Sequence, residues 1–96
     1  MTTIADATSK LLVISTAHVS KETCEAASAK NIDWAVTHPT PYGFFAYCHE
    51  DRADESHNDL WAVLQFAVAR DFHYVLFDAD ADVLDQSEAG LEIFEW

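Results

Sequence analysis

The chain has 96 residues and a formal net charge of -12, because 17 acidic side chains outnumber 5 Lys plus Arg. Half of its residues are hydrophobic, so it can bury enough apolar surface to fold as a single domain, residues 1–96. The charge disfavours direct binding to nucleic acid or to an anionic membrane, since both need clustered Lys and Arg. No apolar run approaches the ~18 residues of a membrane span. The first ten residues lack the basic-then-apolar order of a signal peptide, which indicates a cytoplasmic protein.

The charge is concentrated in the second half of the chain. Residues 1–48 hold four acidic side chains against three Lys, a net charge of -1. Residues 49–96 hold thirteen acidic side chains against Arg52 and Arg70, a net charge of -11. This predicts an anionic surface that attracts basic partners. The alternative is a solvated surface that only keeps copies of the protein apart in solution.

The first half predicts two short strands and a helix before an aromatic strand. Residues 1–9 are expected to form a loosely ordered start, and residues 11–14, LLVI, are typical of a buried strand. Ser20 is a good N-cap for a helix that ends near Lys30. A second strand is expected at 34–36.

Two prolines interrupt the region that follows. Residues 38–41 are predicted to form a turn, because neither Pro39 nor Pro41 can donate a backbone hydrogen bond to a sheet. The aromatic segment 42–48 is expected to be the next strand.

The second half predicts a loop, a helix and two strands. Residues 50–58 are polar and charged, and Ser56 with Asp59 matches a capping box for a helix from about 58 to 70. On that helix, Phe66 falls outside the apolar stripe. Residues 74–77 are typical of a buried strand. The tail, residues 91–96, alternates apolar and acidic side chains, as a half-buried strand does.

The element order is strand, helix, strand, strand, helix, strand, followed by the extra C-terminal strand. This order predicts an α+β fold: a ferredoxin-like βαββαβ two-layer sandwich, with helices on one face of a mostly antiparallel sheet. An open α/β sandwich with another strand order is the alternative.

The segment 75–85 contains four alternating or near-alternating carboxylates after an apolar strand. It resembles the Asp-x-Asp motif of haloacid-dehalogenase-type hydrolases, which would make Asp78 a nucleophile and Asp80 an acid/base beside Mg²⁺. Ala81 and Asp82 stand where that family has Gly-Thr, and only 11 residues follow Asp85. An EF-hand also fails, since Val83 stands at the glycine position. A solvated loop is therefore expected here.

Other catalytic and metal-binding patterns are weak. Five His and two Cys invite a zinc hypothesis, and Cys48-His49-Glu50 resembles part of a zinc-ligand string. However, no Cys-x-x-Cys and no His pair at helical spacing accompany it. Ser15 and His18 are near in sequence, but no nucleophile elbow surrounds them. We therefore expect neither an enzyme, nor a cofactor, nor a bound metal.

The remaining signal is a surface for a partner. Carboxylates at i and i+2 on extended chain lie roughly 6.6 Å apart on one side, and such rows imitate a phosphate backbone and attract grooves lined with Lys and Arg. Exposed aromatic side chains beside charge often mark interfaces. The predicted partner-binding residues are Asp78, Asp80, Asp82, Asp85, Glu50, Asp51, Asp54, Glu55, Phe66 and Trp96.

Five segments in order carry a resemblance to a known family. They are Ser15-Thr16-Ala17-His18, Tyr42-Gly43-Phe44-Phe45-Ala46-Tyr47, Asp59-Leu60, Leu76-Phe77-Asp78-Ala79-Asp80 and the terminal Trp96. From about residue 12 to 96 the chain resembles a small domain family of unknown function from proteobacterial phages, plasmids and integrated elements. The resemblance implies no activity, but it suggests a mobile-element setting.

In size and charge the chain is also similar to acidic phage anti-CRISPR proteins. We therefore expect a non-enzymatic inhibitor of a basic nucleic-acid-binding host protein, specifically a CRISPR effector, that acts by nucleic-acid mimicry. The alternatives are an antitoxin-like partner of a basic toxin, a small metal-binding domain that uses Asp78 and Asp80, and a homodimer held through Phe66, Trp61 or the terminal strand.

Overall fold

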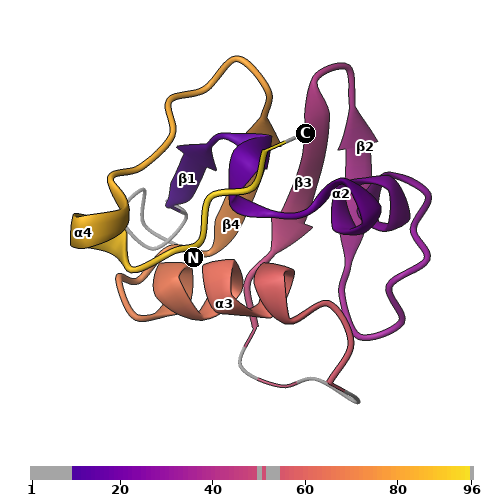
Figure 1. The fold of residues 1–96 in the computed structure, drawn as a ribbon. Coiled ribbons are helices and arrows are strands. Elements are labelled where there is room, and N and C mark those ends of the chain that lie inside the picture. The colour runs from indigo at the N-terminus through magenta and orange to yellow at the C-terminus, as the bar shows by residue number, and fades with distance from the viewer. Residues whose placement is uncertain (1–9, 50, 52–54, 96) are drawn as a thin grey trace.

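The computed structural model describes residues 10–49, 51 and 55–95. The elements in chain order are β1 (Leu11–Ile14), η1 (Thr16–His18), α2 (Lys21–Ser28), β2 (Thr37–Thr40), β3 (Gly43–Tyr47), α3 (Asn58–Val68), β4 (Tyr74–Asp78) and α4 (Gln86–Ala89) (Figure 1). The expected loose start at residues 1–9 lies outside the described residues, as do three of the predicted site residues: Glu50, Asp54 and Trp96.

The four strands form one mixed sheet in the order β1-β4-β3-β2. β1 pairs in parallel with β4, and the other two pairs are antiparallel. Consequently β1, β2 and β4 point toward one end of the sheet and β3 points toward the other. We call the end at which β4 finishes the upper end and the end at which β3 finishes the lower end, as they are drawn in Figure 1.

The α+β class is confirmed, but the expected ferredoxin-like strand order is not found. In that arrangement β1 would lie inside the sheet, whereas here it is an edge strand that pairs only with β4. The burial of the two strands reflects these positions. β4, in the interior, buries Val75 and Phe77 completely, while β1, at the edge, buries only Ile14 to that degree. The interior strand therefore contributes more of its apolar surface to the core.

The second strand lies later in the chain than the sequence predicted. β2 spans Thr37–Thr40, so residues 34–36 are not a strand and the predicted turn at 38–41 is largely wrong. Pro39 is tolerated because β2 is an edge strand with β3 as its single partner among the described strands. The missing N–H of Pro39 also blunts this edge against pairing with another chain.

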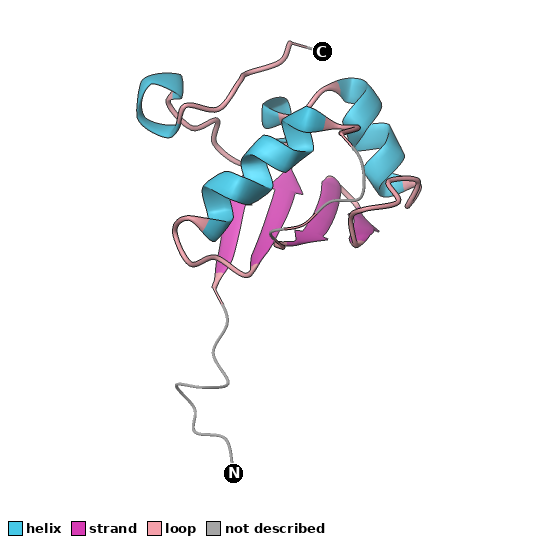
Figure 2. Ribbon diagram, turned by 90° about the horizontal axis from the view of Figure 1, so that it is seen from below, coloured by secondary structure: helices cyan, strands magenta, loops and turns pink. Residues whose placement is uncertain are grey.

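The helices cover one face of the sheet, as expected (Figure 2). The inner face of the sheet carries Phe44 and Phe77, whose rings stack with centroids 4.4 Å apart. Leu60 and Leu64 of α3 complete this core, and both are fully buried. None of the described helices is long and apolar enough to cross a bilayer.

A buried polar network joins the starts of the two main helices. Asp59 accepts hydrogen bonds from the Ser20 backbone N–H at 2.7 Å and from the Thr23 hydroxyl at 2.8 Å. The predicted capping box is therefore wrong: the N-cap is His57, in the left-handed region at φ 54°, with no side-chain cap. Ser56 instead accepts a bond from the indole N–H of Trp34. Asp59 therefore fixes α2 against α3, and its Oδ1 also accepts a bond from the Leu60 N–H in the first turn of its own helix, at 3.0 Å.

The predicted C-terminal strand is not formed among residues 91–95. The tail packs on η1 instead of on a sheet edge, and the Phe94 N–H donates to the Ala17 carbonyl at 2.7 Å. His18, which is almost fully buried, bonds to the tail and to the segment before α4. Its Nε2 accepts from the Leu84 N–H at 2.9 Å, and its Nδ1 donates to the Glu92 carbonyl at 3.1 Å. The Phe94 N–H and the Glu92 carbonyl of the tail are therefore bonded to η1 residues rather than to a neighbouring strand.

Candidate binding surfaces

The structure separates the two groups of acidic residues that the sequence suggested for one interface. Asp78, Asp80 and Asp82 follow β4 at the upper end of the sheet. Asp51 and Glu55 follow β3, which runs antiparallel to β4, and so lie at the lower end. Figure 1 shows the two connecting segments at opposite ends of the molecule. A single flat surface therefore does not contact both groups.

The upper group continues into the C-terminal segment and forms the larger acidic surface. Residues 78–95 contain no Lys or Arg. Of their carboxylates, Asp78 is half-buried and the other six are exposed. We call this set the acidic segment: Asp78, Asp80, Asp82, Asp85, Glu88, Glu92 and Glu95. Its recorded side-chain bonds are local, with Asp78 accepting from the Asp80 N–H at 2.8 Å.

Asp85 caps α4, and the capping hydrogen bonds perturb its own titration. Its Oδ1 accepts bonds from the Ser87 hydroxyl at 2.7 Å and from the Ser87 N–H at 2.9 Å. These bonds favour the charged form and lower the pKa of the Asp85 carboxyl below its ordinary value. The predicted partner residue Asp85 is thus also a structural residue for the short helix.

Of the two predicted aromatic anchors, Phe66 and Trp96, only Phe66 lies among the described residues. Phe66 is half-buried against the core, and the Arg70 guanidinium lies 3.8 Å from its ring centroid. Trp61 packs edge-on against Trp34 with ring centroids 5.6 Å apart. Of the contacts named for the alternative homodimer, Phe66 and Trp61 are half-buried, and residues 91–95 form no strand.

The alternative of a metal site, and the reactivity of the two cysteines, can be examined in the described part of the chain. No group of three or more His, Cys, Asp or Glu side chains there has the geometry to hold a metal ion. Burial raises the pKa of the Cys48 thiol, and burial with the charge of Glu25 raises that of Cys24. Both thiols are therefore protonated and weakly nucleophilic at neutral pH.

The surface that sequence reasoning missed is the sheet face opposite the helices. In the strands, alternate residues point away from the core. Seven of these form a continuous group, of which six are apolar or aromatic and one is a His. We call them the outer sheet face: Leu11, Val13, His38, Phe45, Tyr47, Tyr74 and Leu76. All are half-buried or exposed, and Val13 keeps 48% of its surface accessible.

Aromatic rings form the centre of this outer sheet face. The rings of Phe45, Tyr47 and Tyr74 lie 5.3 to 5.4 Å from one another by centroid, and they belong to the neighbouring strands β3 and β4. His38 on β2 extends the group, with its ring 6.0 Å from that of Tyr47. The aromatic contacts hold these side chains in one arrangement. The rings therefore form a preformed platform rather than a set of independent surface residues.

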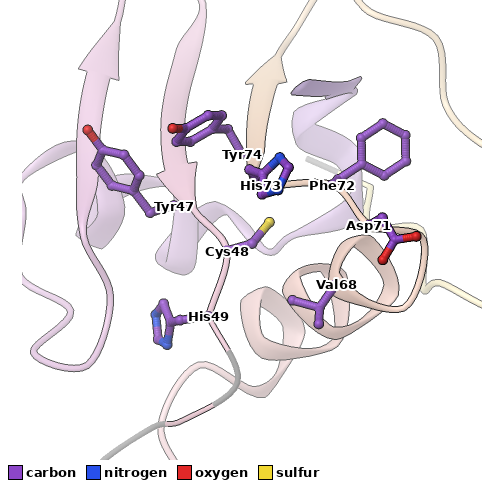
Figure 3. A pocket seen from close by; sticks show the side chains of 8 residues that line it. All are labelled: Tyr47, Cys48, His49, Val68, Asp71, Phe72, His73 and Tyr74. Carbon is purple, nitrogen blue, oxygen red and sulfur yellow. The ribbon is translucent and has the colours of Figure 1, made fainter. Parts of the chain in front are cut away.

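An open cavity of about 490 Å³ continues this platform at the lower end of the sheet. Tyr47 and Tyr74 of the platform line it, together with Cys48, Phe72 and His73 (Figure 3). The Cys48 sulfur points toward His73, whose Nδ1 already accepts a bond from the Lys10 N–H at 3.0 Å. The volume suits a small ligand or a partner side chain.

The neighbouring His49 also lines the cavity; like Cys48 it lies beyond the end of β3, and its side chain points away from that of Cys48 (Figure 3). Its ring packs edge-on against Trp34, 5.8 Å between centroids, and its Nδ1 donates to the Asp51 carbonyl. Its buried Nε2 has no hydrogen-bond partner among the described residues. Since Trp34 and Trp61 occupy the space around the ring, His49 is better explained as a packing residue than as a ligand of the cavity.

The sequence signal for the outer sheet face was present but ambiguous. The runs LLVI, GFFAY and YVLF are apolar at every position, which is typical of strands covered on both faces. Only the structure shows that the helices cover a single face. The continuous runs indicated that both faces of the strands are apolar. In the structure, none of the described helices covers the second face.

Comparison with known proteins assigns a family but no activity. Residues 11–96 match the C-terminal domain of a family of unknown function, DUF5983. No curated protein and no solved structure matches the chain. The family match extends from the first residue of β1 through the acidic segment, and so includes both candidate surfaces. The chain belongs to the DUF5983 family, as its C-terminal domain.

Proposed function

We propose that this protein is a non-enzymatic inhibitor that binds a basic, nucleic-acid-handling protein through its acidic segment. The observation that supports this most strongly is the clustering of seven carboxylates in residues 78–95, without one Lys or Arg among them. A CRISPR effector is the partner class to test first, because its guide and target channels are lined with basic residues that hold phosphates. Nucleic-acid mimicry is the mechanism that this charge pattern favours.

The acidic segment is held in place, which suits a recognition surface. His18 bonds to the backbone at Leu84 and Glu92 with its two ring nitrogens, and these positions bracket α4. Leu91, buried between them, adds an apolar contact to the core. A segment that is ordered before binding loses less conformational entropy when it meets its partner. The carboxylates at 85, 88 and 92 thereby keep a defined spacing.

The lower acidic group is assigned a smaller role. Asp51 and Glu55 are exposed but lie at the other end of the sheet. They contribute to the long-range field that draws a basic partner toward the protein, without contact in the complex. Neutralising them should slow association and leave the dissociation rate nearly unchanged.

The test compares two triple variants with the same net charge. In the first, Asp80→Asn, Asp82→Asn and Glu88→Gln remove three exposed carboxylates of the acidic segment. In the second, Glu22→Gln, Glu25→Gln and Asp33→Asn remove three exposed carboxylates from α2 and the segment after it. Each changes the formal charge from -12 to -9. Binding to purified guide-loaded CRISPR effectors, and inhibition of their DNA cleavage, are then measured at low and moderate salt.

We expect the first variant to bind about tenfold more weakly and with a shallower salt dependence, and the second to change affinity less than about twofold. Equal weakening of both variants would show that only net charge matters, which contradicts the proposed surface. Undiminished cleavage by every effector tested, with no binding at low salt, would contradict the proposed partner class.

A further inference from the structure

We propose that the outer sheet face is a self-association surface, on which a second copy of this chain packs face to face. The inference is independent of the acidic segment and of the inhibitor function. It rests on two features of the described residues: the apolar rows across the strands and the absence of charge from those rows. The size of the face then sets how strong the complex is expected to be.

The strand register places the apolar side chains in two continuous rows. Leu11, Tyr74 and Tyr47 are neighbours across β1, β4 and β3. Val13, Leu76 and Phe45 form the parallel row one step further up, and His38 on β2 ends it. Leu11, Val13 and Tyr47 keep 45%, 48% and 39% of their surfaces accessible. An apolar patch of this continuity on a folded domain marks an interaction site.

The charge distribution decides which occupant fits. The two rows contain no carboxylate, and the nearest one on the same strands is Asp78, at the upper limit of β4. Most acidic groups of the described residues lie at the two ends of the sheet, in α2 and α3 or in the segment that follows β4. A strongly basic partner would gain nothing from an uncharged face. Two copies with a net charge of -12 each repel one another least where the two uncharged rows meet, away from Asp78 at the upper end of β4.

The area of the face predicts a weak complex. Four strands at a spacing of ~4.8 Å and about five residues of ~3.3 Å give a projected face of roughly 19 by 17 Å. Two such faces bury less than the ~1,200 Å² at which stable interfaces begin. Packed sheets of this kind lie ~10 Å apart with interdigitated side chains. We therefore expect a dimer that forms reversibly at high protein concentration.

Added salt should change the affinity of this dimer in the opposite direction to the affinity of the proposed inhibitor complex. Raising the ionic strength screens the repulsion between two anionic copies, so the dimer becomes tighter. The same change weakens an acidic surface bound to a basic partner. One titration of salt therefore separates the two proposals, and either can fail without the other.

The experiment is sedimentation velocity on the full chain over a wide range of protein concentration, at about 50 mM and about 500 mM NaCl. Two variants with matched exposure serve as test and control: Val13→Lys on the outer sheet face, and Val83→Lys on the acidic segment, where the parent side chains are 48% and 46% exposed. We expect dimerisation of the parent chain to strengthen with salt. Val13→Lys should weaken it at least about tenfold, since the lysine would be buried unpaired, and Val83→Lys should retain it.

Three outcomes would overturn the inference. The first is a parent chain that stays monomeric at the highest concentration at both salts. The second is equal weakening by Val13→Lys and Val83→Lys, which would place the contact elsewhere. The third is a Val13→Lys monomer that loses as much thermal stability as a core substitution, because the face would then be covered within one copy. Concentration-dependent amide shifts confined to β1, β3 and β4 would support the inference by a separate measurement.

Discussion

The two faces of the sheet carry similar side chains but have different surroundings. Adjacent residues on β3, Phe44 and Phe45, differ only in direction: Phe44 is fully buried beneath the helices, and Phe45 belongs to the half-exposed outer sheet face. The same division separates Phe77 from Leu76 on β4. The comparison shows that apolar content alone does not report which face is core. The position of α2 and α3 decides it.

The largest effect is expected when each of the two phenylalanines is truncated separately, because only one of them belongs to the core. Phe44→Ala removes a ring stacked on Phe77 at 4.4 Å and leaves a cavity, so the free energy of unfolding should fall by about 3–5 kcal/mol. Phe45→Ala removes contacts with Tyr47 and Tyr74 on a partly hydrated face, and should cost about 1 kcal/mol. Urea denaturation of the monomer at low protein concentration measures both.

A cost for Phe45→Ala that equals that of Phe44→Ala would show that the outer sheet face is buried within one copy. Because Phe44→Ala removes a large share of the stability of a small domain, Phe44→Leu serves as the milder variant. It should still cost more than Phe45→Leu at the adjacent position.

A second change tests what keeps the helices over the inner face. Asp59→Ala removes the acceptor for the Ser20 N–H and the Thr23 hydroxyl, and it leaves both donors without their partner at the junction of α2 and α3. We expect the free energy of unfolding to fall by about 2 kcal/mol. Asp59→Asn keeps one acceptor oxygen and should lose less. If Asp59→Ala does not measurably lower the stability in a thermal melt, this network does not hold the two helices in place.

The smallest effect concerns the acidic segment and its dependence on pH. The pKa of Asp85 is lowered by its bonds to Ser87, so its contribution to α4 is present at neutral pH. That contribution is lost as the pH falls through the lowered folded value, below the ordinary range of an aspartate. The amide signals of Ser87 and Glu88 should then report fraying of α4 while the core remains folded. Asp85→Asn keeps an acceptor oxygen that does not titrate, and should abolish this transition.

Glycines mark two places where the backbone limits substitution. A Cβ at Gly43 would lie 1.9 Å from the Phe77 carbonyl oxygen, so only glycine permits the close pairing of β3 with β4. Gly90 ends α4 with φ at 70° and has open space around it. The first is required by tertiary contact and the second by local conformation. Their sequence contexts do not distinguish these reasons.

Much of the secondary structure was predictable from local pattern. The helix after Ser20, the helix over 58–68 and the strands around residues 11–14, 43–47 and 74–78 follow from capping, apolar spacing and β-branched or aromatic runs. The strand at Thr37–Thr40 was missed because a proline argues against a strand unless the strand is known to be an edge. The tail was misassigned because its alternating pattern was satisfied by contacts with η1 and His18 rather than by a sheet.

The candidate surfaces divide in the same way. The charge asymmetry, the acidic composition of residues 78–95 and the apolar runs are visible in the sequence alone, because they depend only on which residues are neighbours in the chain. The fold was needed to show that the two acidic groups lie at opposite ends, that Arg70 lies over the ring of Phe66, and that one sheet face is left without helices. Each of these depends on strand order and helix placement. Both are set by long-range packing, which no local pattern encodes.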